Sequence, residues 1–204
     1  YRAVIDTMID RNEITSILDE YDNDNVKIGL VGSHSALDVC DGAIEEGFRT
    51  HLVCQAGREK TYTKYFKAER DPSGNLLRGI VDDAVVYSRF DEVLQPENQQ
   101  YLRDNNILFV PNRSFTSYCS IDAIENDFAV PMVGSRNLLR SEERGGEEDY
   151  YWLLEKAGLP YPERIDDPED IDELVMVKLP HAVKKLERGF FTASDYNEYL
   201  EKSK

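Results

Sequence analysis

The sequence lacks any run of about eighteen consecutive apolar residues, and its opening stretch, YRAVIDTMIDRNEITSIL, carries charges throughout. A membrane-spanning helix needs such a run, and a signal peptide needs an uncharged apolar core. We therefore expect a cytoplasmic protein that has no membrane partner.

Cysteine is scarce as well. Cys40, Cys54 and Cys119 lie far apart and show no CxxC spacing. That pattern disfavours both a structural zinc site and a disulfide framework. We predict three buried thiols and no metal site in the chain.

Positive charge is also in short supply, because 24 lysines and arginines face 40 acidic residues, for a net charge of −16. Nucleic acids need a basic surface that releases counterions, so they are not expected partners. The densest acidic runs, SEERGGEED and PERIDDPEDIDE, lie in the second half, away from the segments that we expect to receive an anionic ligand. The motifs GxxxxGK[ST] and GxGxxG are absent, so the P-loop and dinucleotide-fingerprint interpretations lack support.

Short apolar runs alternate with helical patterns in residues 1–127. Strands are predicted at 26–31, 50–54, 84–87 and 107–110, and helices at 36–44 and 96–106. Gly47 is expected to end the first of these helices in a left-handed conformation. The alternation predicts an α/β fold with a mostly parallel sheet in an N-terminal, nucleotide-like domain.

The pattern changes in residues 128–204, which we expect to form the beginning of a second domain. FAVPMVGSRNLLR predicts a strand followed by a helix, and DYYWLLEKAGLPYP predicts a further helix. LVMVKLP and GFFTA predict a β-hairpin with a long tip. A last helix is expected to begin at Ser194, with the serine hydroxyl as its cap and Asp195 in its first turn.

The loop Gly32-Ser33-His34-Ser35 follows the first predicted strand, where open parallel sheets bind their ligands. Backbone N–H groups and a helix dipole favour a phosphate there, and the hydroxyls and the imidazole add donors. Two structural alternatives remain open: Ser35 caps the helix together with Asp38, and His34 is a hydrogen-bonded loop residue.

Two more segments are expected at the same edge of the sheet. Ser114 follows the strand at 107–110 and should come near His34, although it can equally cap a helix. Arg58 follows the second strand and can grip a phosphate through its planar fork, unless it is merely an exposed arginine.

Lys178 lies inside the apolar strand VMVKLP, where it either binds an anion such as an ATP phosphate or extends into solvent. His51 and His181 have no neighbours that suggest metal ligation, and we interpret both as structural or surface residues.

Several segments together resemble one enzyme family: GSHSALDVC, AGREKTYTKYF, VPNRSFTSYC, VPMVGSRNLLR, EKAGLPYP and LVMVKLP. Over nearly its whole length the chain resembles the archaeal formate-dependent ligase family PurP of the ATP-grasp superfamily. The resemblance implies a pre-ATP-grasp, substrate-binding domain at 1–127 and the beginning of an ATP-grasp domain at 128–204. It also implies a homo-oligomeric ligase of purine (IMP) biosynthesis. That ligase converts AICAR, formate and ATP to formyl-AICAR, ADP and phosphate, with Mg²⁺ as cofactor.

The same resemblance assigns roles to residues. It implies that His34 and Ser114 contact AICAR, that Gly32, Ser33 and Ser35 shape the same loop, and that Arg58 is a further candidate. Lys178 resembles the ATP-grasp lysine that binds nucleotide phosphates.

The chain departs from the family pattern in two ways. HAVKKLERG stands where the family has a glycine-rich phosphate loop, so Lys184, Lys185 and Arg188 are the expected substitutes as charged ATP ligands. The acidic magnesium ligands are expected in a later half that is missing, which suggests a fragment or an unresolved remainder. Two alternatives follow: a paralogue that binds a phosphoribosyl ligand without ATP chemistry, or an ATP-grasp ligase for another acid and amine.

Overall fold

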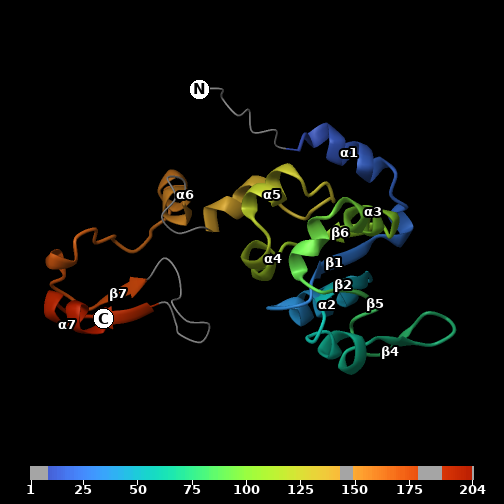
Figure 1. Cartoon of the computed structure of the whole chain (residues 1–204), viewed down its shortest axis with the longest axis horizontal. Helices are drawn as coiled ribbons and strands as arrows, with labels where there is room; N and C mark the ends of the chain where they lie inside the picture. The colour runs from blue at the N-terminus through green and yellow to red at the C-terminus, as the bar shows by residue number, and fades with distance from the viewer. Residues whose placement is uncertain (1–8, 143–148, 179–189, 204) are drawn as a thin grey trace. The chain divides into compact units, whose positions relative to one another are not determined.

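The structure is a computed structural model that describes residues 9–142, 149–178 and 190–203. The chain divides into two compact units, 1–139 and 140–204. Each unit is described by itself below (Figure 1).

The first unit is built on a four-stranded parallel sheet in the order β5-β2-β1-β6. Its strands are β1 (Lys27–Val31), β2 (Arg49–Gln55), β5 (Asp83–Tyr87) and β6 (Ile107–Phe109). The four strands predicted from apolar runs are confirmed, and so is their parallel pairing. A two-stranded antiparallel hairpin, β3 (Glu69–Arg70) and β4 (Leu76–Arg78), lies between β2 and β5 in the chain.

Helices cover both faces of this sheet. Alternate residues of β1 and β2 point to opposite faces, so that Leu30 and Leu52 belong to one apolar core and Val31 and Val53 to another. The first core includes α2 (Ala36–Glu45), and the second is completed by α3 (Pro96–Asp104), α4 (Arg113–Tyr118) and α5 (Ile121–Asn126). An outer helix, α1 (Arg11–Asp19), precedes β1.

Local signals set the ends of these helices. Gly47 has a φ of 84°, and the N–H of Phe48 donates to the carbonyl of Ala43 at 2.8 Å, which ends α2 as predicted. Cys40, Cys54 and Cys119 are all buried, as predicted.

The first unit extends beyond the boundary expected at 127. Phe128 and Val130 are fully buried in the same core as Phe109. The N–H of Phe109 donates to the carbonyl of Pro131 at 2.8 Å. A single bridge between Phe109 and Met132 replaces the predicted strand, because a proline cannot donate to a continuing ladder. The helix that follows is a 3-10 helix, Arg136–Glu142.

The second unit contains α6 (Tyr150–Lys156), an antiparallel pair formed by β7 (Val175–Lys178) and β8 (Phe190–Ala193), and α7 (Tyr196–Lys202). The predicted hairpin strands are confirmed. The predicted Ser194 cap is wrong, because Asp195 caps α7 and accepts from the N–H of Glu198 at 2.9 Å. A carboxylate is a stronger acceptor than a hydroxyl at this position.

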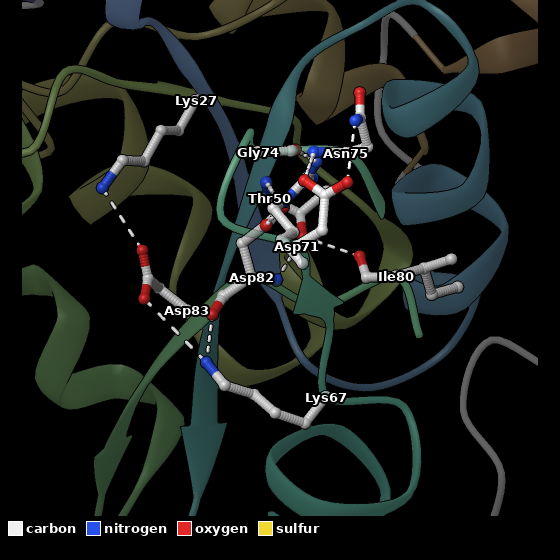
Figure 2. A network of polar contacts seen from close by, with 10 residues as sticks. Lys27, Thr50, Lys67, Asp71, Gly74, Asn75, Ile80, Asp82 and Asp83 are labelled. Carbon is white, nitrogen blue, oxygen red and sulfur yellow. Dashed lines mark hydrogen bonds and ion pairs between the residues drawn. The ribbon is translucent and has the colours of Figure 1, made fainter. Parts of the chain in front are cut away.

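A polar network holds the β3–β4 hairpin against the amino-terminal end of the sheet (Figure 2). Asp82 accepts from the guanidinium of Arg70 at 2.6 Å and from the N–H of Thr50 at 3.1 Å. Burial alone would raise the pKa of Asp82, but these hydrogen bonds outweigh it and the pKa lies below its ordinary value. Lys27 and Lys67 approach Asp83 from two sides, at 3.3 and 3.9 Å.

His51 lies buried in β2, where its ring packs against Tyr101 at a centroid distance of 5.6 Å. Neither ring nitrogen has a hydrogen-bond partner among the described residues. Burial lowers the pKa of His51 to about 4, although the nearby Asp83 carboxylate opposes this shift. Of the two interpretations, structural or surface, burial excludes the surface one.

We expect His51 to make the fold sensitive to acid. Its folded-state pKa is below the unfolded value, so the unfolded chain binds the proton more readily and stability falls as pH decreases from about 6.5 towards about 4. Between about pH 7 and about pH 4.5 the shift corresponds to about 2 kcal/mol. Denaturant unfolding at both pH values should show a smaller loss for His51→Gln than for the native chain. Equal losses in the two proteins would contradict the assignment.

Candidate functional site

The candidate site lies at the carboxyl-terminal edge of the parallel sheet. The chain leaves β1 at Gly32, β2 at Ala56 and β6 at Val110. Because the three strands run parallel and in register, their following loops emerge at the same edge. The loop of residues 32–35 after β1 is called the β1 loop below.

The β1 loop has a fixed backbone. The N–H of Gly32 donates to the carbonyl of Val53 at 2.7 Å, and Ser35 adopts a left-handed conformation with a φ of 61°. Ser35 precedes α2 but makes no side-chain cap bond, so the Ser35–Asp38 capping alternative is wrong. Its hydroxyl instead lies 2.8 Å from the Nδ1 atom of His34, which is exposed.

Arg58 reaches across to the β1 loop from the end of β2. Its guanidinium donates to the hydroxyl of Tyr118 at 2.9 Å and to the hydroxyl of Ser33 at 3.4 Å. The same group lies 5.7 Å from the ring centroid of Phe90 and 5.9 Å from that of Tyr118. No carboxylate forms an ion pair with Arg58 within the described ranges. An exposed cation held by hydroxyls and rings is suited to binding an anion.

The loop after β6 meets the β1 loop through Asn112. Its amide nitrogen donates to the carbonyl of Val31 at 2.9 Å and to that of His34 at 3.0 Å. The two loops therefore converge, as expected. Ser114 lies two residues further on, in the first turn of α4, and is 5% exposed. The cap of that helix is Asn112, so the alternative in which Ser114 caps the helix is wrong. Contact between Ser114 and a ligand stays a prediction.

Tyr62 contacts the β1 loop from the segment that follows β2. It lies in a short π-helix, Thr61–Tyr65, and its hydroxyl donates to the carbonyl of Ser33 at 3.4 Å. A Cβ atom at Gly32 would lie 3.0 Å from the sulfur of Cys54 and 3.2 Å from the ring of Tyr62. The loop thus comes close to the sheet only because position 32 carries no side chain.

Tyr62, Asn112 and Tyr118 were not predicted as site residues. All three stand in or beside the segments that carry the family resemblance. Their roles depend on contacts with residues 29 to 81 positions away in the sequence, as for Asn112 and Val31.

The second unit holds the candidate ATP residue. Lys178 lies on the exposed face of β7, where its ammonium donates to the hydroxyl of Tyr151 at 3.1 Å. The ammonium also lies 5.8 Å from the centroid of the Tyr151 ring. Lys184, Lys185, Arg188 and His181 lie outside the described residues.

Other regions of the described chain offer less. No group of three potential metal-ligating side chains comes together in the described ranges. No helix in those ranges is long and apolar enough to cross a membrane. A hollow of about 580 Å³ lies beside α1 and α3, on the side where β6 begins rather than at the loops described above. Its lining mixes carboxylates with Arg103 and Tyr21, and both of these already bond to protein carbonyls.

Comparison with known proteins shows that the chain matches one protein family. The family described as "Protein of unknown function (DUF1246)" matches residues 28–165. The chain is 42% identical over 197 residues to a 5-formaminoimidazole-4-carboxamide-1-(beta)-D-ribofuranosyl 5'-monophosphate synthetase of Methanopyrus kandleri. It is 38% identical over 195 residues to the protein of the same name from Methanothermobacter thermautotrophicus. These alignments cover 96% and 95% of the chain and 50% and 49% of the relatives.

One solved structure also resembles this chain. The crystal structure of an IMP biosynthesis protein PurP from Thermococcus kodakaraensis is 26% identical and superposes with a TM-score of 0.51. The match covers 81% of this chain and 48% of that one. The resemblance expected from the motifs is confirmed, and so is the α/β fold class. The chain spans about half the length of the curated relatives it matches.

A pair of glycine substitutions tests the close packing under the β1 loop. Gly32→Ala should lower the free energy of unfolding by about 1–3 kcal/mol, because its new methyl group overpacks against Cys54 and Tyr62. Gly42→Ala is the matched control. It lies in α2 with nothing within 4 Å of its Cβ position and should stabilise the protein by up to about 1 kcal/mol. Denaturant unfolding measures both effects, and a neutral Gly32→Ala would mean that the loop has room to spare.

Proposed function

This chain belongs to the protein family described as DUF1246, and we propose that it supplies the AICAR-binding part of an ATP- and formate-dependent ligase. In this proposal the ligase converts AICAR to formyl-AICAR in purine biosynthesis, with release of ADP and phosphate. The names of the relatives, synthetase and IMP biosynthesis protein, support this reaction.

The observation that carries the proposal is the contact between Arg58 and the β1 loop. Arg58 and Ser33 come from the ends of neighbouring parallel strands, and their polar atoms lie 3.4 Å apart. The chain has a net charge of −16, yet this edge presents a guanidinium with no carboxylate paired to it in the described part. A phosphoribosyl group has the complementary charge and accepts hydrogen bonds from such a fork.

Each residue of the β1 loop has a proposed part in holding AICAR. Ser33 and Arg58 bind the phosphate, and the exposed imidazole of His34 donates to the ligand. Ser35 orients His34 through the 2.8 Å contact between them, and Gly32 allows the loop to approach the sheet. Ser114 is proposed to contact AICAR from the first turn of α4. No catalytic acid or base is assigned, because the protein's part is orientation and charge neutralisation.

The ATP-grasp assignment of the second unit rests on Lys178. Its ammonium is exposed on β7 and makes contact with an uncharged phenol, so it is available to nucleotide phosphates. ATP bound with Mg²⁺ would transfer its terminal phosphoryl group to formate and leave as ADP. The amine of AICAR would then attack the formyl carbon, and phosphate and a proton would be released. Lys184, Lys185 and Arg188 remain proposed as further phosphate ligands. A cytoplasmic homo-oligomer with no nucleic-acid partner is part of the same proposal.

Calorimetric titration of AICAR into the chain tests the first unit. Arg58→Ala should weaken AICAR binding by about tenfold to a hundredfold, because a charged hydrogen bond is lost. His34→Ala should weaken it by about tenfold. Arg89→Ala is the control, because Arg89 follows β5 but pairs with Asp91. Equal AICAR affinity of the Arg58→Ala and Arg89→Ala variants would contradict the proposal that Arg58 binds the phosphate.

ATP binding and turnover, measured on a protein that spans the full length of the relatives, test the second unit. Lys178→Met should abolish measurable ATP binding, whereas Lys156→Met, whose ammonium lies over the ring of Trp152 in the same unit, should leave it unchanged. ADP release should require AICAR and formate together. If AICAR binds but ATP does not bind even to a protein that spans the full length of the relatives, the protein is a phosphoribosyl-binding paralogue and not the ligase. If ADP release depends on another acid and amine, the protein is a different ATP-grasp ligase.

A further inference from the structure

Asn112 occupies the junction between the two loops that carry the proposed AICAR residues. Its amide nitrogen donates to the carbonyl of Val31, where β1 ends, and to the carbonyl of His34, in the β1 loop. Its amide oxygen accepts from the N–H of Phe115 at 3.1 Å and so caps α4, the helix that carries Ser114. One side chain therefore contacts a strand end, a loop and a helix start.

The hydrogen-bond pattern also fixes the orientation of this amide. Two carbonyl oxygens face one end of the side chain and a backbone N–H faces the other, so only one assignment of nitrogen and oxygen satisfies all three bonds. Both N–H donors of Asn112 are used within the protein. The side chain thus has no donor left for a ligand, and any effect on binding must pass through the groups that it holds.

The β1 loop needs such support. Ser35 is held in a left-handed conformation, which costs about 1 kcal/mol for a residue other than glycine. The side chain of His34 is exposed, and its ring contacts the hydroxyl of the neighbouring Ser35. The bond from Asn112 links the peptide of His34 to a residue 78 positions away.

We propose that Asn112 is a positioning residue that fixes the position of the β1 loop, which carries His34, relative to α4. It acts on ligand binding through His34 and Ser114 and does not touch the ligand itself. The inference rests on the proposed AICAR site. It adds to that site the residue that fixes the position of the β1 loop relative to α4.

Two substitutions separate this role from helix capping. In Asn112→Asp, a carboxylate oxygen still caps α4, but both donors to the carbonyls of Val31 and His34 are lost. In Asn112→Ser, a hydroxyl can cap the helix and is too short to reach the β1 loop. Asn98→Asp is the matched control, because Asn98 also donates to a backbone carbonyl, that of Glu92 at 2.7 Å, but lies in α3.

The expected result is a change in binding without a loss of folding. At about pH 7, Asn112→Asp and Asn112→Ser should each raise the Kd for AICAR about tenfold relative to the native chain. The denaturant midpoint should fall in both variants because two hydrogen bonds are lost, but each should still unfold in one cooperative transition. Asn98→Asp should leave the Kd unchanged.

Acid should rescue only one of the variants. A protonated carboxyl at position 112 has an O–H that can donate to the carbonyl of His34 again. The ratio of the Asn112→Asp Kd to the native Kd should therefore fall as the pH is lowered from about 7 towards about 4, where an ordinary aspartate becomes protonated. The Asn112→Ser ratio should not recover.

A second measurement needs no ligand. Hydrogen exchange of the unliganded chain should show faster exchange for amides of residues 32–36 in Asn112→Asp, with α4 still protected. Native-like exchange together with a native-like Kd would overturn the inference. If neither the native chain nor a protein that spans the full length of the relatives binds AICAR, the proposed function fails, and the exchange comparison still decides whether Asn112 holds the loop.

Discussion

Strand β1 is hydrogen-bonded on both sides, to β2 in one direction and to β6 in the other. Gly29 allows β6 to pack closely against β1, because a Cβ atom at position 29 would lie 2.2 Å from the side chain of Ile107. Because all three strands are parallel, their carboxyl ends cannot be separated without breaking the ladder. The register of β1 therefore determines where the chain leaves the sheet, and every contact among the β1 loop, Arg58 and Asn112 depends on it.

The two ends of the sheet have different chemistry. At the amino-terminal end, Lys27, Lys67 and Arg70 all contact Asp82 or Asp83, so the charges neutralise one another and anchor a hairpin. At the carboxyl-terminal end, Arg58 is held by hydroxyls and aromatic rings. Those groups orient a cation without cancelling its charge. A strongly acidic chain can in this way keep one local site for an anionic ligand.

Sequence patterns were informative where the signal is local. The strands and α2 follow from apolar periodicity, and Gly47 from its backbone preference. The sequence could not place Phe128 and Val130 in the first unit, because an apolar run does not reveal which core it joins. It predicted Ser194 as a cap where the adjacent Asp195 competes better. The contacts of Asn112 and Tyr118 were missed because they connect distant residues through single hydrogen bonds and have no periodicity.

The three buried thiols divide between the two faces of the sheet. Cys40 and Cys54 belong to the core beneath α2, and Cys119 belongs to the core on the opposite face. Burial raises the pKa of each thiol to about 12, so almost no thiolate exists at neutral pH. An alkylating reagent can then react only when the covering helices separate from the sheet. The chain thus carries its own reporters of local opening, and the order in which its cysteines become labelled records which layer detaches first.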